Sequence, residues 1–369
     1  MPSLCRLLRS AILGPALVLA GCGASGETLV PLEQIRARWG APALGAAAFE
    51  GDRVTWLEVV GVRRLGDPTP ATRGDRFHLG SCGKAMTATL VATFVDEGRL
   101  DWDSRLDQEW PELAPLMHPE YRAMTLAHLL SHRAGIDDEA LVARLGPALD
   151  TSLSLPEQRR WAAERVLSET PTRPGEYAYS NLGYTVVGAL LENVGGASWE
   201  DLMVRRLFEP LGMLSCGFGT PGTPGLVDQP WGHLEQGGVL VPVEPGSAAD
   251  ADPMVMAPAG YLHCSLDDWA KFALLHLRGA RGDAALVTSD SFERMHTPWP
   301  GGQYAFGWAV NETAGGPVLS HSGSNERSYA VVLLDVPQGR GAMAVANCGG
   351  SAGEGATSEA LAAVMEGLR

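Results

Sequence analysis

Residues 81–98 read SCGKAMTATLVATFVDEG, a short polar segment that leads directly into an apolar run. The large apolar side chains recur at three- and four-residue spacing, which is typical of a helix with one buried face. They are Met86, Leu90, Val91, Phe94 and Val95. Gly98 follows, and glycine is the residue that most often ends a helix. We therefore expect a helix over 82–97 that begins beside Ser81 and Lys84.

Ser81 and Lys84 lie three residues apart, so they share one face of this helix. The free backbone N–H groups at a helix start favour developing negative charge, and a nearby lysine can activate a serine as a nucleophile. Cys82 is a rival nucleophile, because a thiolate at a helix start is reactive. It is rotated by about 100° from Ser81, so both cannot face Lys84. The structural alternative is a helix cap followed by a solvated lysine.

A second candidate, Tyr179-Ser180-Asn181, stands directly before a strongly periodic helical run. A tyrosine phenol can move a proton when nearby cations lower its pKa. An asparagine amide offers both a donor and an acceptor to a substrate amide. Taken alone, the triplet also fits a packed tyrosine followed by a helix cap.

A third candidate, His321-Ser322-Gly323, follows an apolar strand-like stretch and precedes Ser324. A glycine here lets a substrate backbone approach the strand edge, and a histidine can supply a proton or a positive field. A histidine at the end of a strand is the structural alternative.

Strand patterns gather at the two ends of the chain, and helical patterns fill its middle. Strands are expected over residues 43–49, 54–62, 305–310, 317–321, 328–336 and 341–348. Residues 101–210 are mainly helical, most clearly over 181–194 and 198–208, and further helices are expected over 265–277 and 355–368. Residues 215–260 are rich in Gly and Pro and are expected to be irregular. This order predicts an α+β fold, in which strands from both termini form an antiparallel sheet flanked by helices.

The predicted catalytic domain covers 33–369, with a mostly α-helical subdomain inserted over roughly 85–225. A chain of 369 residues can bury a core without metal or disulfide support. A net charge of -15 argues against a nucleic-acid binder, which needs clustered cations to neutralise phosphates. Of the 28 cations only Lys84 and Lys271 are lysines, and lysine is the cation whose pKa shifts most readily.

The first residues have the composition of an export signal. Arg6 and Arg9 precede an apolar run over 11–20 that is too short for a finished transmembrane helix. The run ends at Leu19-Ala20-Gly21-Cys22, which resembles a bacterial lipoprotein processing site. We expect residues 1–21 to be removed, Cys22 to carry lipid and 22–32 to form a tether, with an ordinary secretory signal as the alternative. The mature chain then has 26 cations and 43 acids, a net charge of -17, so membrane attachment depends on the lipid.

Four cysteines remain in the mature domain: Cys82, Cys216, Cys264 and Cys348. Their wide spacing leaves all three possible pairings open. Because a protein of this length does not depend on bridges, we expect mostly free, buried cysteines that act as small apolar side chains.

The three triplets, in this order, resemble the signature of the serine penicillin-recognising enzymes. The resemblance is strongest to the branch that holds class C β-lactamases, DD-peptidases and related esterases. Further blocks that look like this family lie at 78–81, 94–100, 126–135 and 210–213, so the resemblance covers nearly the whole mature chain. Two segments depart from the pattern: the usual paired glycines read Ala259-Gly260-Tyr261, and the stretch after His-x-Gly reads 324–327 as SNER. Both departures affect the expected rim of the site.

The resemblance implies an acyl-enzyme mechanism on Ser81, with Lys84 and Tyr179 sharing the proton handling. The backbone N–H groups of Ser81 and Ser324 would form an oxyanion hole beside Gly323. Asn181 would orient the acyl side. A histidine at 321 in place of lysine implies a weaker, pH-dependent field, as in the peptidase and esterase members.

The implied substrate is a small ester or a D-amino-acid amide or peptide, with β-lactamase or DD-carboxypeptidase activity as the alternative. No cofactor, metal or nucleic-acid partner is implied, and we expect a monomer. The protein would be an exported lipoprotein, anchored through Cys22 and facing the periplasm or the cell exterior. A different class of function is a non-catalytic lipoprotein that binds peptidoglycan or β-lactams.

Two other motifs compete with this interpretation. The run 349–353 matches the Gly-x-Ser-x-Gly nucleophile elbow around Ser351, but that fold needs an acid and then a histidine later in the chain. Residues 352–369 hold no His and no Asp. His128 and His132 have the four-residue spacing of two zinc ligands, without the Glu that a zinc-protease motif places beside the first histidine.

Overall fold

The computed structural model describes residues 32–368 except Ala284. The expected signal peptide, the lipid site Cys22 and all but the last residue of the expected tether lie outside the described residues. Within the described part, no helix combines the length and the apolar character needed to cross a membrane.

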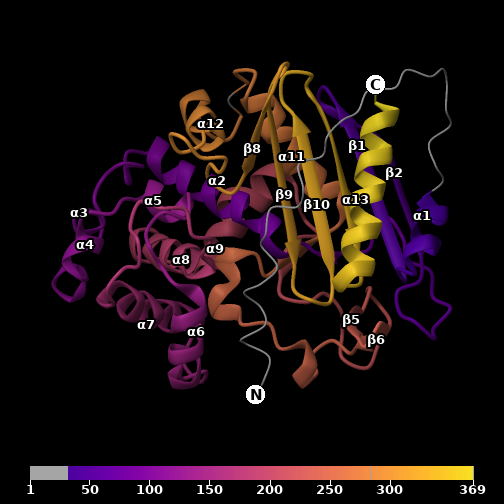
Figure 1. The fold of residues 1–369 in the computed structure, drawn as a ribbon, viewed down its shortest axis with the longest axis horizontal. Coiled ribbons are helices and arrows are strands. Elements are labelled where there is room, and N and C mark those ends of the chain that lie inside the picture. Colours follow the sequence, from indigo (N-terminus) through magenta and orange to yellow (C-terminus); the bar gives the residue numbers. More distant parts are fainter. Residues whose placement is uncertain (1–31, 284, 369) are drawn as a thin grey trace.

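A six-stranded antiparallel sheet joins the two ends of the chain in the order β2-β1-β11-β10-β9-β8 (Figure 1). Its strands are β1 (Ala43–Glu50), β2 (Arg53–Gly61), β8 (Ala309–Thr313), β9 (Gly316–Ser324), β10 (Tyr329–Asp335) and β11 (Arg340–Ala346). The N-terminal β1 pairs directly with β11, with Leu44 opposite Ala346. The expected α+β fold, with an antiparallel sheet made from both termini, is confirmed. The strand expected over 305–310 begins later, at Ala309.

Alternating side chains of β11 build two different cores, because successive residues of a strand point to opposite faces. Met343 and Val345 belong to the large core that includes Leu266 of α11 (Leu266–Gly279). Ala342, Ala344 and Ala346 belong to a second core with α1 (Leu32–Trp39) and α13 (Gly350–Gly367). The small alanines allow α13 to pack closely on that face of the sheet (Figure 1).

The helical part of the chain surrounds α2 (Gly83–Asp96), which is buried from Gly83 through Phe94. The other α-helices are α3 (Leu106–Glu109), α4 (Pro119–Arg122), α5 (Leu126–Leu130), α6 (Asp138–Leu145), α7 (Leu155–Ser168), α8 (Asn181–Gly195), α9 (Trp199–Met203), α10 (Glu209–Leu211) and α12 (Ser289–His296). The helix expected over 198–208 ends as a π-turn, Val204–Phe208, after α9. The short helix α12 was not expected from the sequence.

The segment over 215–260 is more ordered than its Gly and Pro content predicts. It contributes β4 (Gly217–Phe218) to a three-stranded sheet with β3 (Phe77–His78) and β7 (Leu262–Cys264), and it forms a hairpin of β5 (Gly232–Gln236) and β6 (Val239–Val243). The expectation of mostly free cysteines was wrong for Cys216 and Cys264, which form a disulfide. Because β4 pairs with β7, the two Cα atoms lie 4.1 Å apart despite a sequence separation of 48. Cys82 and Cys348 are free and buried.

Candidate active site

Ser81 lies in a single 3₁₀ turn, Gly80–Cys82, between β3 and α2. Gly80 has a φ of +57°, a left-handed conformation that glycine adopts without strain. A Cβ atom at Gly80 would lie 2.1 Å from the backbone nitrogen of Ser324 on β9. The turn therefore requires glycine both for its conformation and for the close approach of β9.

Lys84 occupies the first turn of α2 and is completely buried. Its ammonium donates to Ser81 Oγ at 3.2 Å, to Asn181 Oδ1 at 2.7 Å and to the carbonyl oxygen of Ala259 at 2.6 Å. Burial lowers the pKa of Lys84 to about 7, although the charge of Asp138 acts to raise it. Lys84 can therefore exchange a proton with Ser81 near neutral pH.

Tyr179 and Asn181 reach the site from the start of α8, where Ser180 caps the helix by accepting from the N–H of Gly183. The Lys84 ammonium lies 4.7 Å from the centre of the Tyr179 ring. The Tyr179 hydroxyl is buried and makes no hydrogen bond of ordinary geometry within the described chain. Burial raises its pKa, and the hydroxyl of Ser81 acts against this. Tyr179 is placed to relay a proton rather than to be a standing phenolate.

The end of β9 brings Gly323 and Ser324 against the nucleophile turn. A Cβ atom at Gly323 would lie 2.3 Å from the backbone nitrogen of Ser81. No side chain fits between the two segments, so the peptide groups of Ser81 and Ser324 are close neighbours. This is the arrangement that an oxyanion hole made of two backbone N–H groups requires.

His321 precedes these residues on β9 and is half-buried. Its Nδ1 lies 2.6 Å from the carbonyl oxygen of Ser322, and its Nε2 lies 2.9 Å from the hydroxyl of Tyr304. A carbonyl oxygen only accepts, so Nδ1 carries the proton and Nε2 accepts from Tyr304. Burial and the Lys84 charge lower the pKa of His321 to about 4. A lowered pKa shifts the charged form of His321 to more acidic pH, in the direction of the weaker, pH-dependent field expected from the sequence.

The structure adds Asp138, at the start of α6, which the sequence analysis did not select. Its carboxylate is buried and accepts from Ser180 Oγ at 2.5 Å, from the N–H of Asn181 at 2.5 Å and from the N–H of Leu182 at 3.3 Å. Burial raises its pKa to about 6, against these hydrogen bonds. Asp138 fixes the segment that carries Tyr179 and Asn181. The available signal was its position directly after the family-like block 126–135.

His132 is the second residue that was missed in this role. It is buried, its Nδ1 accepts from the N–H of Ser180 at 3.0 Å, and its ring packs on Tyr179 with centroids 4.2 Å apart. His128, the other histidine of this four-residue spacing, lies 2.8 Å from the Thr125 hydroxyl. Within the described residues, no group of three His, Cys, Asp or Glu side chains is arranged to hold a metal ion.

The rival nucleophiles lie in different surroundings. Cys82 is buried, and its thiol donates to the His321 carbonyl oxygen at 3.5 Å. Burial raises the pKa of this thiol far above neutral, so it does not form the reactive thiolate. Ser351 lies at the exposed start of α13, where its hydroxyl donates to Glu235 Oε2 at 3.0 Å. Neither side chain has the lysine and tyrosine that accompany Ser81.

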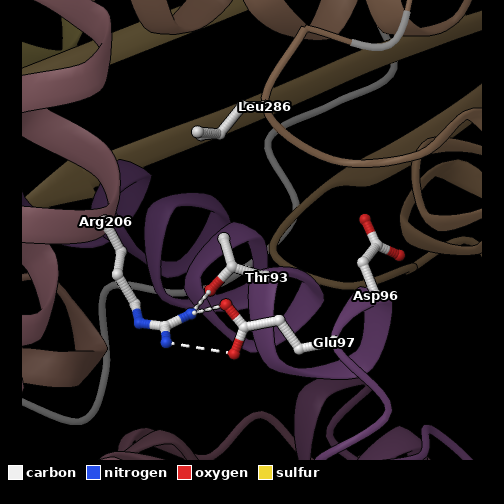
Figure 2. A pocket seen from close by; sticks show the side chains of 5 residues that line it. All are labelled: Thr93, Asp96, Glu97, Arg206 and Leu286. Atoms are coloured by element: carbon white, nitrogen blue, oxygen red, sulfur yellow. Dashed lines mark hydrogen bonds and ion pairs between the residues drawn. The ribbon is translucent and has the colours of Figure 1, made fainter.

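A surface pocket at the opposite end of α2 lacks such chemistry (Figure 2). It is lined by Thr93, Asp96, Glu97, Arg206 and Leu286. Arg206 is paired with Glu97 at 2.9 Å, and Asp96 accepts from the N–H and hydroxyl of Thr288. The length of α2 separates this pocket from Ser81 by about 20 Å, so the pocket is not part of the candidate active site.

A family model described as Beta-lactamase matches residues 32–364. This chain belongs to the beta-lactamase family. It is 28% identical over 310 residues to penicillin-binding protein 4 of Amycolatopsis lactamdurans, which covers 77% of this chain and 74% of that relative. The family membership confirms the resemblance inferred from the three motifs.

Solved structures share the fold. The octameric penicillin-binding protein homologue from Pyrococcus abyssi aligns with a TM-score of 0.71 at 24% identity, over 91% of this chain and 77% of that one. D-amino acid amidase from Ochrobactrum anthropi SV3, in complex with L-phenylalanine amide, aligns with a TM-score of 0.70 at 21% identity, over 91% and 96%. Other beta-lactamase relatives are longer, and the chain spans 53% of the length of two of them. The protein is thus a beta-lactamase-family hydrolase related to penicillin-binding proteins.

Proposed function

We propose that the protein is an exported serine hydrolase that forms an acyl-enzyme on Ser81. The observation that carries this proposal is the contact of a completely buried Lys84, with a pKa of about 7, with the Ser81 hydroxyl at 3.2 Å. A neutral amine at this distance can accept the hydroxyl proton as the oxygen attacks a carbonyl carbon. The Tyr179 hydroxyl provides the path for that proton to the leaving group.

In the proposed reaction, Ser81 Oγ forms a bond to the carbonyl carbon and its proton passes to Lys84. The N–H groups of Ser81 and Ser324 stabilise the oxyanion, and such a donor contributes about 3 to 4 kcal/mol to transition-state stabilisation. The leaving alcohol or amine takes the proton through Tyr179, and the acyl group stays on Ser81. Water then attacks the ester by the same proton route in reverse and regenerates the free serine.

The proposed substrate is a small ester or a D-amino-acid amide or peptide. A neutral His321, whose two ring nitrogens already contact Ser322 and Tyr304, supplies no positive charge, which suits an uncharged leaving group better than a carboxylate. The 28% identity to a penicillin-binding protein supports DD-carboxypeptidase or β-lactamase activity as the second candidate. The first candidate agrees with the fold shared with the D-amino acid amidase.

Export and lipid attachment at Cys22 belong to the same proposal. The disulfide between Cys216 and Cys264 supports it, because such bonds persist in oxidising compartments outside the cytoplasm. The monomeric state is likewise part of the proposal.

A substrate panel tests the proposed function. Purified mature protein is given short-chain nitrophenyl esters, D-amino-acid amides, a D-Ala-D-Ala peptide and nitrocefin, and turnover of each is measured. We expect the highest kcat/KM for an ester or amide, complete dependence on Ser81 in a Ser81→Ala variant, and no dependence on Ser351 in Ser351→Ala. Binding of these compounds without any turnover would support a non-catalytic binding protein instead.

A further inference from the structure

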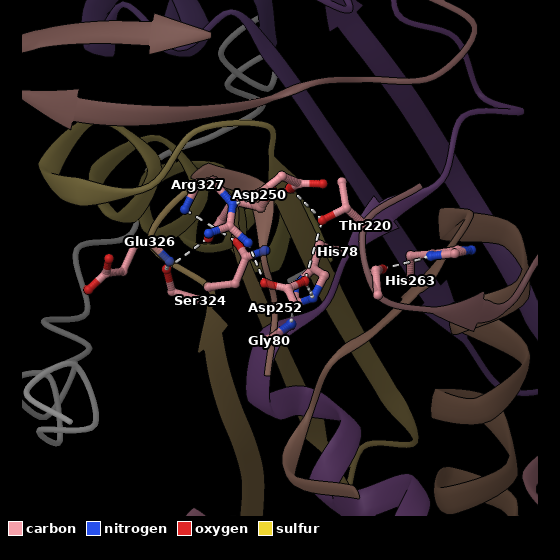
Figure 3. A network of polar contacts seen from close by, with 12 residues as sticks. His78, Gly80, Thr220, Asp250, Asp252, His263, Ser324, Glu326 and Arg327 are labelled. Atoms are coloured by element: carbon pink, nitrogen blue, oxygen red, sulfur yellow. Dashed lines mark hydrogen bonds and ion pairs between the residues drawn. The ribbon is translucent and has the colours of Figure 1, made fainter. Parts of the chain in front are cut away.

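A buried network of polar side chains contacts the two segments that carry Ser81 and Ser324 (Figure 3). His78 on β3 is 2% exposed, Arg327 after β9 is 8% exposed, and the Asp252 side chain between them is 5% exposed. No step of the proposed reaction uses these three residues. Their contacts nevertheless end at the backbone of the nucleophile turn and at the turn after Ser324.

The contact of His78 with Gly80 fixes the protonation of its ring. The N–H of Gly80 donates to His78 Nδ1 at 3.1 Å, so Nδ1 is unprotonated. The ring proton therefore lies on Nε2, which is 3.3 Å from Asp252 Oδ2. Nε2 makes no hydrogen bond of ordinary geometry within the described residues, and the negative charge of Asp252 beside it favours the tautomer that leaves Nδ1 free to accept from Gly80.

The other oxygen of Asp252 accepts from the guanidinium of Arg327. Arg327 also donates to the carbonyl oxygen of Ala249 at 3.3 Å and lies 3.4 Å from Asp250. These contacts anchor the turn between β9 and β10, in which the N–H of Glu326 donates to Ser324 Oγ at 3.0 Å. One carboxylate thus connects the turn before Ser81 to the turn after Ser324.

The turn that carries Ser81 and the end of β9, which leads into the second connected turn, touch without any side chain between them, at Gly80 and Gly323. No side chain between them can fix their relative position, so residues next to the two segments must do so. Resting on the proposed acyl-enzyme function, we propose that His78, Asp252 and Arg327 are positioning residues. They hold the backbone N–H groups of Ser81 and Ser324 in the spacing that binds the oxyanion.

Two substitutions of His78 test the contacts of its two ring nitrogens separately. An asparagine amide oxygen can occupy the place of Nδ1 and accept from Gly80, whereas a glutamine amide reaches the place of Nε2. Either variant keeps one contact of the ring and loses the other, so the connection between Gly80 and Asp252 is broken in both. We expect kcat to fall about tenfold or more in His78→Asn and about 30- to 100-fold in His78→Gln, with KM within about threefold. The split between kcat and KM identifies loss of transition-state stabilisation.

Asp252→Asn tests the contact between Asp252 and His78 by changing the carboxylate instead of the histidine. The amide oxygen of the variant would face the charged Arg327, which leaves its NH₂ group facing His78 Nε2. The histidine would then move its proton to Nδ1, where it opposes the N–H of Gly80. We expect kcat to fall about tenfold or more, and the same substitution to have little further effect in a His78→Asn background.

His263 provides the matched control, because it pairs with His78 across β3 and β7 and is 6% exposed. Its Nδ1 contacts the carbonyl oxygen of Gly219 at 2.9 Å and not the nucleophile turn. We expect His263→Asn to lower Tm without changing kcat per active site. Sites are counted by end-point labelling with a fluorophosphonate, so that misfolded protein does not lower the measured kcat.

Wild-type kcat per labelled site in both His78→Gln and His78→Asn would overturn the inference. A lower Tm with unchanged kcat per site would assign the network to stability alone. Wild-type protein that neither turns over the panel nor reacts with fluorophosphonate would instead refute the proposed function, and the inference with it. These outcomes are distinct in the same set of measurements.

Discussion

Lys84 and Arg159 are both completely buried cations, but their surroundings differ. Arg159 on α7 is paired with Glu192 at 2.8 Å and with Glu200 at 2.6 Å. Within the described residues, no carboxylate lies within ion-pair distance of Lys84, whose contacts are a hydroxyl, an amide oxygen and a carbonyl oxygen. Burial therefore lowers the pKa of Lys84 to about 7, whereas the two glutamates outweigh burial and raise the pKa of Arg159. A buried cation with carboxylates is structural, and one without them can exchange protons.

The largest expected effect is the loss of activity in Lys84→Met. Removing the amine removes the proton acceptor for Ser81, so kcat/KM for the best substrate should fall by about 10³-fold or more. Lys271→Met is the matched control, because Lys271 is exposed and paired with Asp268 at 2.6 Å on the surface of α11. Its turnover should equal that of the wild type. Comparable losses in both variants would show that Lys84 has no special role.

Arg159→Met should lower stability and leave activity nearly unchanged, the reverse of Lys84→Met. It leaves Glu192 and Glu200 buried or partly buried without their cation, so the free energy of unfolding should fall by about 3 to 5 kcal/mol. Activity per folded molecule should stay within about threefold, since Arg159 contacts none of the candidate site residues. Urea unfolding and active-site titration measure the two effects. A loss of activity without a loss of stability would contradict the structural role.

The pH dependence of stability should also report the lowered pKa of Lys84. The pKa of Lys84 falls from 10.5 to about 7 on folding, so between these values the unfolded chain binds more protons than the folded chain. Stability contributed through this group therefore rises with pH from about 7 to 10.5. The rise should be missing in Lys84→Met and present in Lys271→Met. Identical curves for wild type and Lys84→Met would show that the pKa of Lys84 is not lowered.

A smaller effect is expected for Asp138→Asn. Its charge raises the pKa of Lys84, so its removal should lower that pKa further. If a neutral Lys84 is the base, the acidic limb of the kcat/KM profile lies near pH 7 and should move to lower pH by roughly half a unit or more. An unmoved limb, in protein that unfolds at the wild-type Tm, would exclude Lys84 as the titrating group.

The features that the sequence predicted depend on local periodicity and on motif order. The spacing of Ser81 and Lys84 on one helix face and the strand patterns at both ends were visible without coordinates. The disulfide, the capping of α8 by Asp138 and the contact of His78 with Asp252 join segments far apart in the chain. Such contacts depend on the pairing of β4 with β7 and on the contact of Asp138 with the start of α8, which no local pattern records. The lowered pKa of His321 is another such property, because burial by distant segments and the charge of Lys84 cause it.

The most direct test of the central claim is the location of a covalent adduct. The mature protein is treated with a fluorophosphonate, digested, and the modified residue is identified by peptide mass spectrometry. The account predicts one adduct per chain, on Ser81, with its rate of formation lowered strongly by Lys84→Met and unchanged by Lys271→Met. An adduct on Ser351, or undiminished labelling of a Ser81→Ala variant, would contradict it.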